Sequence, residues 1–290
     1  MHNEPAFPVE LEREIFETTA LMHSSTIPTL LRVARRILLW IEPLLYRVIC
    51  TSTDGDIARA LLKATKSKPP KFFHDAVRHI FLGYTSDWSV EEAVELLELC
   101  TGIVDCVALG ALANPVMLPI LANMRLERLS VSLQELFGPT TSIDPTHPLF
   151  KSITHLDLLQ DIIDGASTCA IPALPALTHL CLADEVSWDV VGSLLEECPR
   201  LEILVNLWDY EGAPLAHAHA GEMPFRDLRF VMGLYKNWIN AWVAGAKGLP
   251  DFWSRADDFV ACKRRGAIAA DCYWLEQPDD ASNVSQSIPS

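Results

Sequence analysis

The sequence predicts an α/β fold in which short parallel strands line one face of a curved solenoid arc and helices line the other. Two observations predict it. The pattern apolar-x-x-apolar-x-apolar, typical of a buried strand, recurs seven times at near-constant spacing, and segments with helical periodicity lie between several of the copies. Half of the 290 residues are hydrophobic, which is enough for a large core. Helical segments outside the repeats are expected at both ends of the chain.

Three short helices are expected within residues 1–50. Pro8 suits the first turn of a helix, and apolar residues follow it at helical spacing from Leu11 onward. Pro28 begins a second helix, and the apolar run 37–41 forms a third. A bundle this small would be marginally stable alone, so it should bind a partner or dock on the repeats.

This segment resembles an F-box, the helical module that binds a Skp-type adaptor in cullin-RING ubiquitin ligases. Family members begin with L-P-x-E-[LI] and an I-F pair, and here Phe7-Pro8-Val9-Glu10-Leu11 and Ile15-Phe16 occupy those places, with Phe7 replacing Leu. The later V-C-R-x-W signature is present only as Val33-Ala34-Arg35-Arg36-Ile37, without its Cys and Trp. The resemblance implies a Skp-type adaptor and a cullin complex as partners, with the adaptor contacted through Phe7, Pro8, Leu11, Ile15 and Phe16. The alternative is that these helices only cap the first repeat.

The seven strand copies are the main sign of repetition. They begin at residues 77, 103, 126, 153, 177, 201 and 228, at intervals of 23 to 27 residues, and the copies 153–158 and 177–182 are nearly identical. Helical periodicity marks the segments 90–100, 117–124 and 189–198. One such unit cannot bury its own apolar side, so the units should stack with parallel strands and right-handed crossovers.

Over about residues 70–235 the chain resembles a leucine-rich-repeat protein, and we assign 51–235 to this arc. The match is to the strand segment L-x-x-L-x-L, and the Asn or Cys that usually follows is missing from most copies, so the repeats are degenerate. Together with the first fifty residues, this resembles a fungal F-box-like protein with degenerate leucine-rich repeats. The alternative is a non-repetitive α/β domain whose buried strands look alike.

Strand alternation predicts which repeat residues point away from the helices. We expect this outward face to bind a target protein through His79, Phe81, Arg128, His155, Asp157, His179, Cys181, Ile203 and Phe230. The alternative is that loops or the C-terminal segment cover the face, in which case these residues are core. A metal site at His155, Asp157 and His179 is disfavoured, because the three lack an established ligand spacing.

A C-terminal helical cap is expected at 236–275. Tryptophans at helical spacing predict two helices, of which the second starts near Asp251 and ends before Gly266, and both should seal the last repeat. Residues 276–290 are polar and predict a disordered tail. The residues 217–219, His-Ala-His, should lie in a solvated, irregular loop before the last strand.

Charge and motifs limit the function. The net charge of −15 disfavours nucleic acid and anionic membranes as partners. We found no phosphate-binding loop, dinucleotide motif, nucleophile elbow or H-E-x-x-H motif in the sequence, and Cys181 beside His155 or His179 is the only pair that suggests catalysis. We therefore expect no enzyme activity, no cofactor and no metal. The first residues show no secretory signal, which favours an intracellular protein with unpaired cysteines.

The expected function is that of a substrate-recognition subunit of a cullin-RING ubiquitin ligase, with the N-terminal module on the adaptor and the repeat face on the target. The alternative is a stand-alone repeat scaffold for protein binding.

Overall fold

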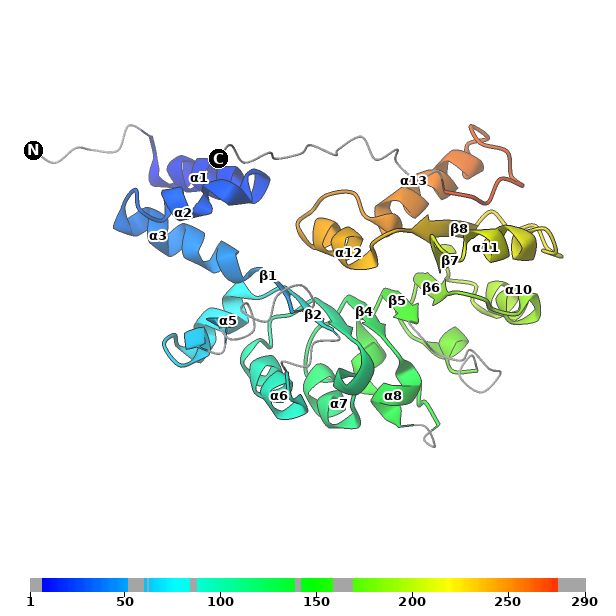
Figure 1. The fold of residues 1–290 in the computed structure, drawn as a ribbon, viewed down its shortest axis with the longest axis horizontal. Helices are drawn as coiled ribbons and strands as arrows, with labels where there is room; N and C mark the ends of the chain where they lie inside the picture. The colour runs from blue at the N-terminus through cyan, green and yellow to red at the C-terminus, as the bar shows by residue number, and fades with distance from the viewer. Residues whose placement is uncertain are drawn as a thin grey trace, which may run out of the picture.

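The computed structural model describes residues 7–51, 60–61, 63–83, 88–138, 142–158 and 169–275. Its centre is one open sheet of eight strands, all parallel to their neighbours and ordered as in the sequence (Figure 1). The strands are β1 (Val48–Cys50), β2 (His79–Leu82), β3 (Asp105–Ala108), β4 (Arg128–Val131), β5 (His155–Leu158), β6 (His179–Ala183), β7 (Ile203–Asp209) and β8 (Phe230–Tyr235). The predicted α/β arrangement with parallel strands is thus confirmed, and β1, which the sequence analysis placed among the N-terminal helices, adds an eighth strand.

Helices lie on both sides of the sheet. The outer side carries α5 (Pro70–Ala76), α6 (Val90–Leu99), α7 (Leu118–Leu121), α8 (Leu133–Phe137), α10 (Trp188–Glu197) and α11 (Ala213–Ala220) (Figure 1). The inner side carries α12 (Trp238–Ala246) and α13 (Phe252–Arg264). The expected helices at 90–100 and 189–198 are present, whereas 117–124 forms a 3-10 turn followed by the short α7.

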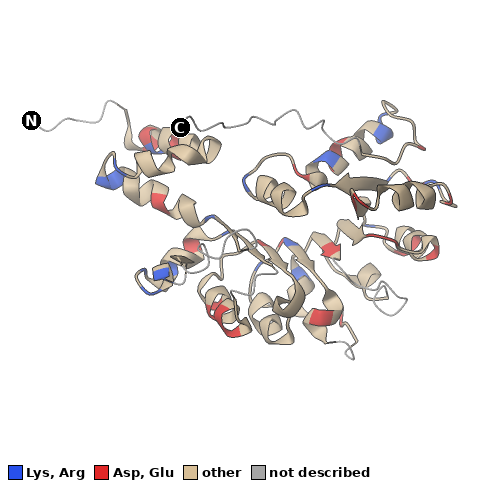
Figure 2. Ribbon diagram, in the orientation of Figure 1, with Lys and Arg blue, Asp and Glu red and all other residues tan. Residues whose placement is uncertain are grey.

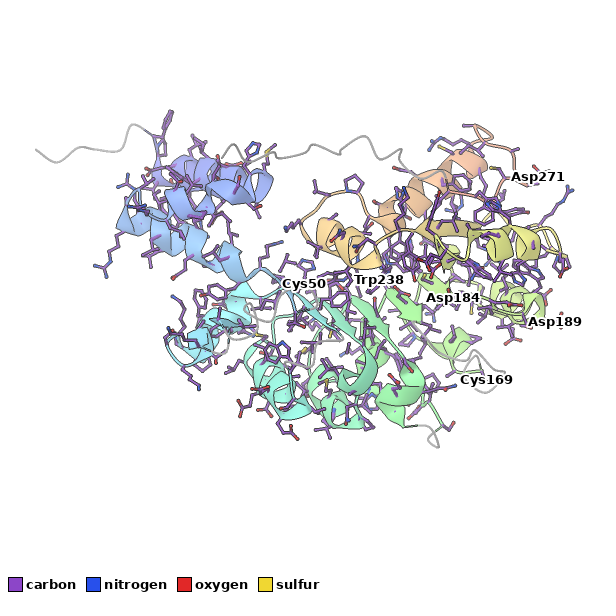
Figure 3. All side chains as sticks on the ribbon, viewed as in Figure 1. Cys50, Cys169, Asp184, Asp189, Trp238 and Asp271 are labelled. Atoms are coloured by element: carbon purple, nitrogen blue, oxygen red, sulfur yellow. The ribbon has the colours of Figure 1, made fainter. Side chains whose placement is uncertain are left out.

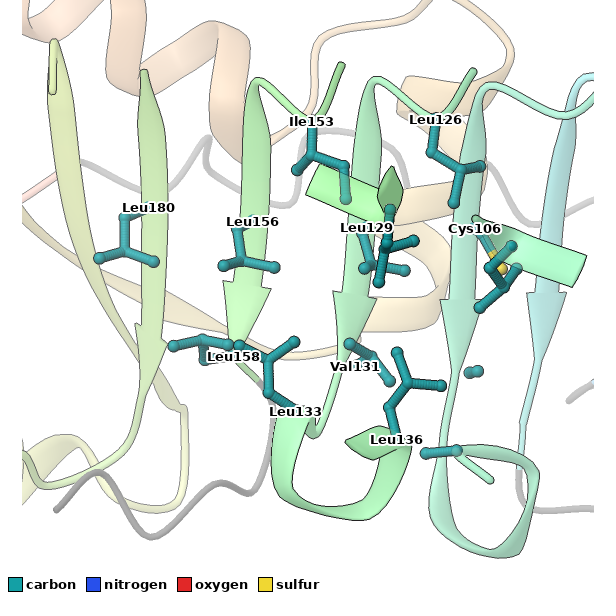
Figure 4. Close-up of a cluster of buried hydrophobic side chains, with 14 of the residues drawn as sticks. Cys106, Leu126, Leu129, Val131, Leu133, Leu136, Ile153, Leu156, Leu158 and Leu180 are labelled. Atoms are coloured by element: carbon teal, nitrogen blue, oxygen red, sulfur yellow. The ribbon is translucent and has the colours of Figure 1, made fainter. Parts of the chain in front are cut away.

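The larger core lies between the sheet and the outer helices. Leu129, Leu156 and Leu180 occupy equivalent positions of β4, β5 and β6, and all three are buried (Figure 4). Leu126 and Ile153 precede the strands at equivalent places and join the same cluster. Each copy of the repeated pattern therefore adds a layer of apolar side chains to one continuous core.

The turns that lead into the strands repeat one hydrogen-bond arrangement. The carbonyl oxygen of Arg78 accepts from the backbone N–H groups of both Val104 and Asp105, at 2.9 and 3.3 Å. The carbonyls of Arg47, Val104, Glu127, Thr154 and Thr178 each accept two N–H groups of the following strand in the same way. These residues consequently stack as a row along the amino-terminal edge of the sheet.

The register of β8 corrects one expectation. Phe230 pairs with Leu204 rather than with Ile203, and it joins the outer core instead of the inner face. Side chains alternate between the two faces of a strand, so a shift of one residue in the last copy moves Phe230 to the opposite face. Val231 takes the inner position.

The N-terminal helices form a separate small bundle. They are α1 (Val9–Met22), α2 (Ile27–Leu30) and α3 (Arg35–Ile41), as the sequence predicts, followed by the 3-10 turn η2 (Glu42–Tyr46). Their core consists of Ala20, Ile27, Ile37 and Ile41. Tyr46 links the bundle to the arc, because its ring packs edge-on against Phe72 and Phe73 at centroid distances of 5.2 and 5.8 Å.

Helix α6 begins with a capping box that offers a first test of the fold. The Ser89 hydroxyl oxygen accepts from the Glu92 N–H at 3.2 Å, and the Glu92 carboxylate accepts from the Ser89 N–H at 3.0 Å. Ser89→Ala should lower the free energy of unfolding by about 1 kcal/mol, measured by urea denaturation. Ser254→Ala tests the second box, at α13, and an unchanged midpoint in both variants would contradict the assignment.

None of the helices in the described ranges is long and apolar enough to cross a membrane. The expected disordered tail, 276–290, lies outside the described residues.

Candidate interaction surfaces

The inner strand face, expected to be an open target-binding surface, is covered by α12 and α13. Phe81 is fully buried and packs against Trp238 and Trp242, with ring centroids 5.4 and 5.3 Å apart, and Trp238 lies between α12 and the strands (Figure 3). Cys181 and Ile203 belong to the same buried cluster. The expectation that these residues are open to solvent is wrong, and the alternative, that the C-terminal segment covers the face, describes the structure.

The covering helices reach far along the sheet instead of sealing only its last repeat. Trp242 Nε1 donates to Asp105 on β3 at 3.3 Å, and Arg128 on β4 forms an ion pair with Asp251 at 2.9 Å. Asp251 is also the N-cap of α13, as the sequence suggests. The free edge of β8 is instead met by residues 273–275, where the Met232 N–H donates to the Tyr273 carbonyl at 2.7 Å and the Leu275 N–H donates to the Met232 carbonyl.

Two histidines of neighbouring strands stack under this cover. The rings of His155 and His179 lie 4.1 Å apart at an interplanar angle of 12°, and Trp253 of α13 meets both edge-on. Each histidine Nδ1 lies 2.8 Å from the hydroxyl of the preceding threonine, Thr154 or Thr178. The repeated Thr-His-Leu sequence thus produces the same local geometry twice, and the parallel register brings the two rings together.

Burial shifts the pKa values of His155 and Asp157 in opposite directions. Burial, followed by the charges of His179 and Arg128, lowers the pKa of His155 to about 3. Burial raises the pKa of Asp157 to about 7, although the neighbouring polar groups of Cys181, Ser130 and Trp238 act against the shift. Near neutral pH, His155 is therefore neutral and Asp157 is partly protonated.

A small cavity adjoins Asp157. Its volume is about 10 Å³, the space of one water molecule, and it is lined by Asp105, Arg128, Ser130, His155, Asp157 and the aromatic residues of α12 and α13. Within the described chain, Asp157 Oδ1 is buried without a hydrogen-bond partner. This space is too small for a substrate, so the layer is an internal contact between the sheet and its cover.

Cys181 does not have the environment of a nucleophile. Burial, assisted by the neighbouring Asp157, raises the pKa of its thiol well above the usual value, and the side chain is fully buried. His179 beside it interacts with Asp257 of α13 at 3.1 Å. The one pair that suggested catalysis is thus enclosed between the strands and α13.

The histidines near residue 217 lie on a helix rather than in an irregular loop, which corrects the expectation. On α11, His219 stacks on Trp188 at 4.0 Å, and its Nε2 lies 2.9 Å from the Val186 carbonyl, while His217 packs against Trp274. No group of three or more His, Cys, Asp or Glu side chains that could hold a metal occurs among the residues described.

The N-terminal bundle presents the main exposed apolar surface. Fourteen large hydrophobic side chains are exposed in the described part of the chain, and nine of them lie within residues 7–45: Phe7, Val9, Leu11, Ile15, Leu21, Met22, Val33, Leu39 and Leu45. We call these nine residues the N-terminal apolar surface. Of the expected adaptor contacts, Phe7, Pro8, Leu11 and Ile15 are exposed, whereas Phe16 is half-buried and packs on the core of the bundle.

A pocket of about 250 Å³ joins this surface to α12. Its walls are mainly apolar, and Arg47 and Lys247 supply its positive charge; the lining residues are Ala20, Leu21, Ser24, Ile27, Leu44, Leu45, Arg47, Val48 and Lys247. Figure 2 shows basic residues at the start of α3 and acidic ones on α1 and on the outer helices α6 and α10. Within residues 7–47 five Arg balance five Glu, so the bundle is close to neutral, whereas the whole chain carries a net charge of −15.

The sequence indicates this cover by α12 and α13 only as an alternative, because the tryptophan spacing predicts an apolar helix face but not which surface that face covers. Comparison with known proteins adds no further assignment: no protein-family model, no curated protein sequence and no solved structure matches the chain.

Proposed function

We propose that the chain is a substrate-recognition subunit of a cullin-RING ubiquitin ligase, in which the N-terminal bundle is a degenerate F-box that binds a Skp-type adaptor. The repeat arc, with its degenerate leucine-rich repeats, holds the target protein. The chain itself does no chemistry and works as an intracellular, non-catalytic connector.

The observation that carries this proposal is the N-terminal apolar surface. Nine of the fourteen large exposed hydrophobic side chains in the described chain lie on one small bundle, and Leu11 and Ile15, four residues apart, share one face of α1. Exposed apolar side chains on one helix face suit a protein-binding site. Phe7, Leu11 and Ile15, which match the F-box pattern, belong to it.

The alternative, a stand-alone scaffold whose first helices only cap the repeats, has less support. A cap would bury Phe7, Leu11 and Ile15 against the arc, yet all three are about half exposed, at 55, 47 and 48%. The bundle has its own core and meets the arc through Tyr46. Target binding must use a surface other than the inner strand face, because α12 and α13 occupy it.

Co-purification with a Skp-type adaptor tests the proposal. Leu11→Asp with Ile15→Asp should abolish the complex, or weaken its Kd by more than tenfold, because both side chains are exposed apolar contacts on α1. Phe16 is unsuitable for this test, since its replacement would disturb the bundle core.

The matched control is Leu215→Asp on α11, an exposed leucine outside the bundle, which should leave adaptor binding unchanged. Circular dichroism should show the same helix content in all three proteins. If the unmodified chain binds no adaptor, the ligase function is excluded and the stand-alone scaffold becomes the better description.

A further inference from the structure

A second groove lies on the arc, at the amino-terminal edge of β2, β3 and β4. Its volume is about 540 Å³, much larger than one phosphate group, and its polar lining consists of His74, Arg78, Thr101, Asn123, Arg125 and Glu127. It is formed by the turns that enter the strands and by the ends of the neighbouring outer helices.

Two arginines in this groove lack partners. Seven of the fourteen described arginines bind an acidic side chain or backbone carbonyls, as Arg36 does with Glu12 and Arg229 with Asp227. Within the described ranges, neither Arg78 nor Arg125 forms an ion pair or a side-chain hydrogen bond. Arg78 is moreover half-buried.

The one carboxylate in the groove does not neutralise them. In the described chain, Glu127 forms no ion pair with Arg78 or with Arg125, which lies two residues before it in the same turn. It is exposed and free to turn toward solvent. Two guanidinium groups thus face one carboxylate, which leaves a local positive charge on a chain of net charge −15.

The groove has a fixed floor at Gly102. A Cβ atom at this position would overlap the His74 carbonyl oxygen of α5 and would lie 3.5 Å from Arg78 Nη1. Only glycine therefore lets the turn after α6 close beneath α5 beside the Arg78 guanidinium. The Thr101 hydroxyl lies 2.8 Å from His74 Nδ1, which holds the imidazole at the rim.

We propose that this groove binds a phosphate monoester dianion, with Arg78 and Arg125 as its principal ligands. The planar guanidinium group donates two parallel hydrogen bonds to an oxyanion, and two such groups match the charge of one phosphate dianion. The groove has room for the carrier of the phosphate as well as for the phosphate itself. This site is separate from the N-terminal apolar surface and does not depend on adaptor binding.

The phosphate group could be carried by a small metabolite or by a phosphorylated side chain of a peptide, since both present the same chemistry. Titration of the full chain with glucose 6-phosphate, with a phosphoserine peptide and with inorganic phosphate, each at constant ionic strength, distinguishes these sources. Binding is measured by calorimetry, and the unphosphorylated peptide is the reference. The tighter of the two monoesters identifies the carrier, whereas inorganic phosphate binding more tightly than both would contradict a monoester site.

Two variants, at Arg125 and Glu127, should change the affinity for phosphate in opposite directions. Arg125→Gln should weaken phosphate binding at least tenfold, whereas Glu127→Gln should tighten it a few-fold by removing the repelling carboxylate. Both residues are exposed, so neither change should impair folding. Arg226→Gln, an exposed arginine outside the groove, should change nothing.

The proposal fails if none of the three ligands binds at millimolar concentration, or if Arg125→Gln binds as tightly as the unmodified chain. It also fails if Arg226→Gln causes the same loss, because binding would then follow general charge rather than this groove.

Discussion

Trp253→Ala should destabilise the protein by about 3–5 kcal/mol, the usual cost of removing a large buried aromatic side chain. Trp253 is 5% exposed and packs edge-on against the stacked rings of His155 and His179. Its loss would open a cavity between α13 and the strands and admit water to the histidines. Urea denaturation followed by fluorescence and circular dichroism measures the change.

The same variant should also raise the pKa of His155, because burial is the main cause of its low value of about 3. Titration of the imidazole resonances by NMR checks this. Leu249→Ala is the control, since Leu249 is 60% exposed just before α13 and should cost less than about 0.5 kcal/mol. A small effect of Trp253→Ala, close to that of the control, would mean that α13 does not cover the strand face in solution.

Asp157→Asn should stabilise the protein, and the gain should grow with pH. Burial raises the pKa of Asp157 from 3.8 to about 7 in the folded chain. Between these two pKa values the folded state binds more protons at Asp157 than the unfolded state does. The stabilising contribution of the protonated Asp157 is therefore complete below pH 3.8 and is lost as the pH rises to about 7. The Asn variant cannot ionise and avoids this loss.

The difference in unfolding free energy between the variant and the unmodified chain should be about 2 kcal/mol at pH 5 and about 4 kcal/mol at pH 8. His155 contributes a pH dependence of opposite sign, because its pKa is lowered, but this contribution is common to both proteins and cancels in the difference. Asp258→Asn, at an exposed position of α13, should show no such trend. A difference that does not change with pH would show that Asp157 is ionised throughout.

The repeated strands could be predicted from the sequence because their signal is local. Each copy of the pattern places apolar residues such as Leu156 and Leu180 at the same places of a short strand, and the spacing sets the parallel register. The strand Val48–Cys50 could not be predicted, because three residues are too few to show the alternation of apolar and polar positions that identifies a strand. The frame of the last copy was misplaced by one residue because Leu228, which is exposed, imitates the first apolar position.

Whether the inner strand face is exposed or covered could not be predicted, because this depends on contacts between distant parts of the chain. The alternation of His155 and Cys181 correctly indicates that they point away from the outer helices. Whether that side meets solvent or protein depends on α12 and α13, and the sequence says only that these helices have an aromatic face. The exposure of Leu11 and Ile15, by contrast, agrees with the expectation taken from the F-box pattern, in which these positions contact a partner.

The cover formed by α12 and α13 has a consequence for synthesis on the ribosome. The contacts of Trp242 with Asp105 and of Asp251 with Arg128 join residues 137 and 123 positions apart. An ordinary repeat array can fold unit by unit as it emerges, since each unit contacts only its neighbours. Here the apolar residues of the inner strand face, such as Phe81, Val107 and Val205, stay uncovered until the last helices leave the exit tunnel. A chain whose synthesis stops before residue 238 would contain all the repeats but would expose the apolar residues of this face and would be prone to aggregation. Chaperones would therefore have to protect the nascent chain until α12 and α13 have been synthesised.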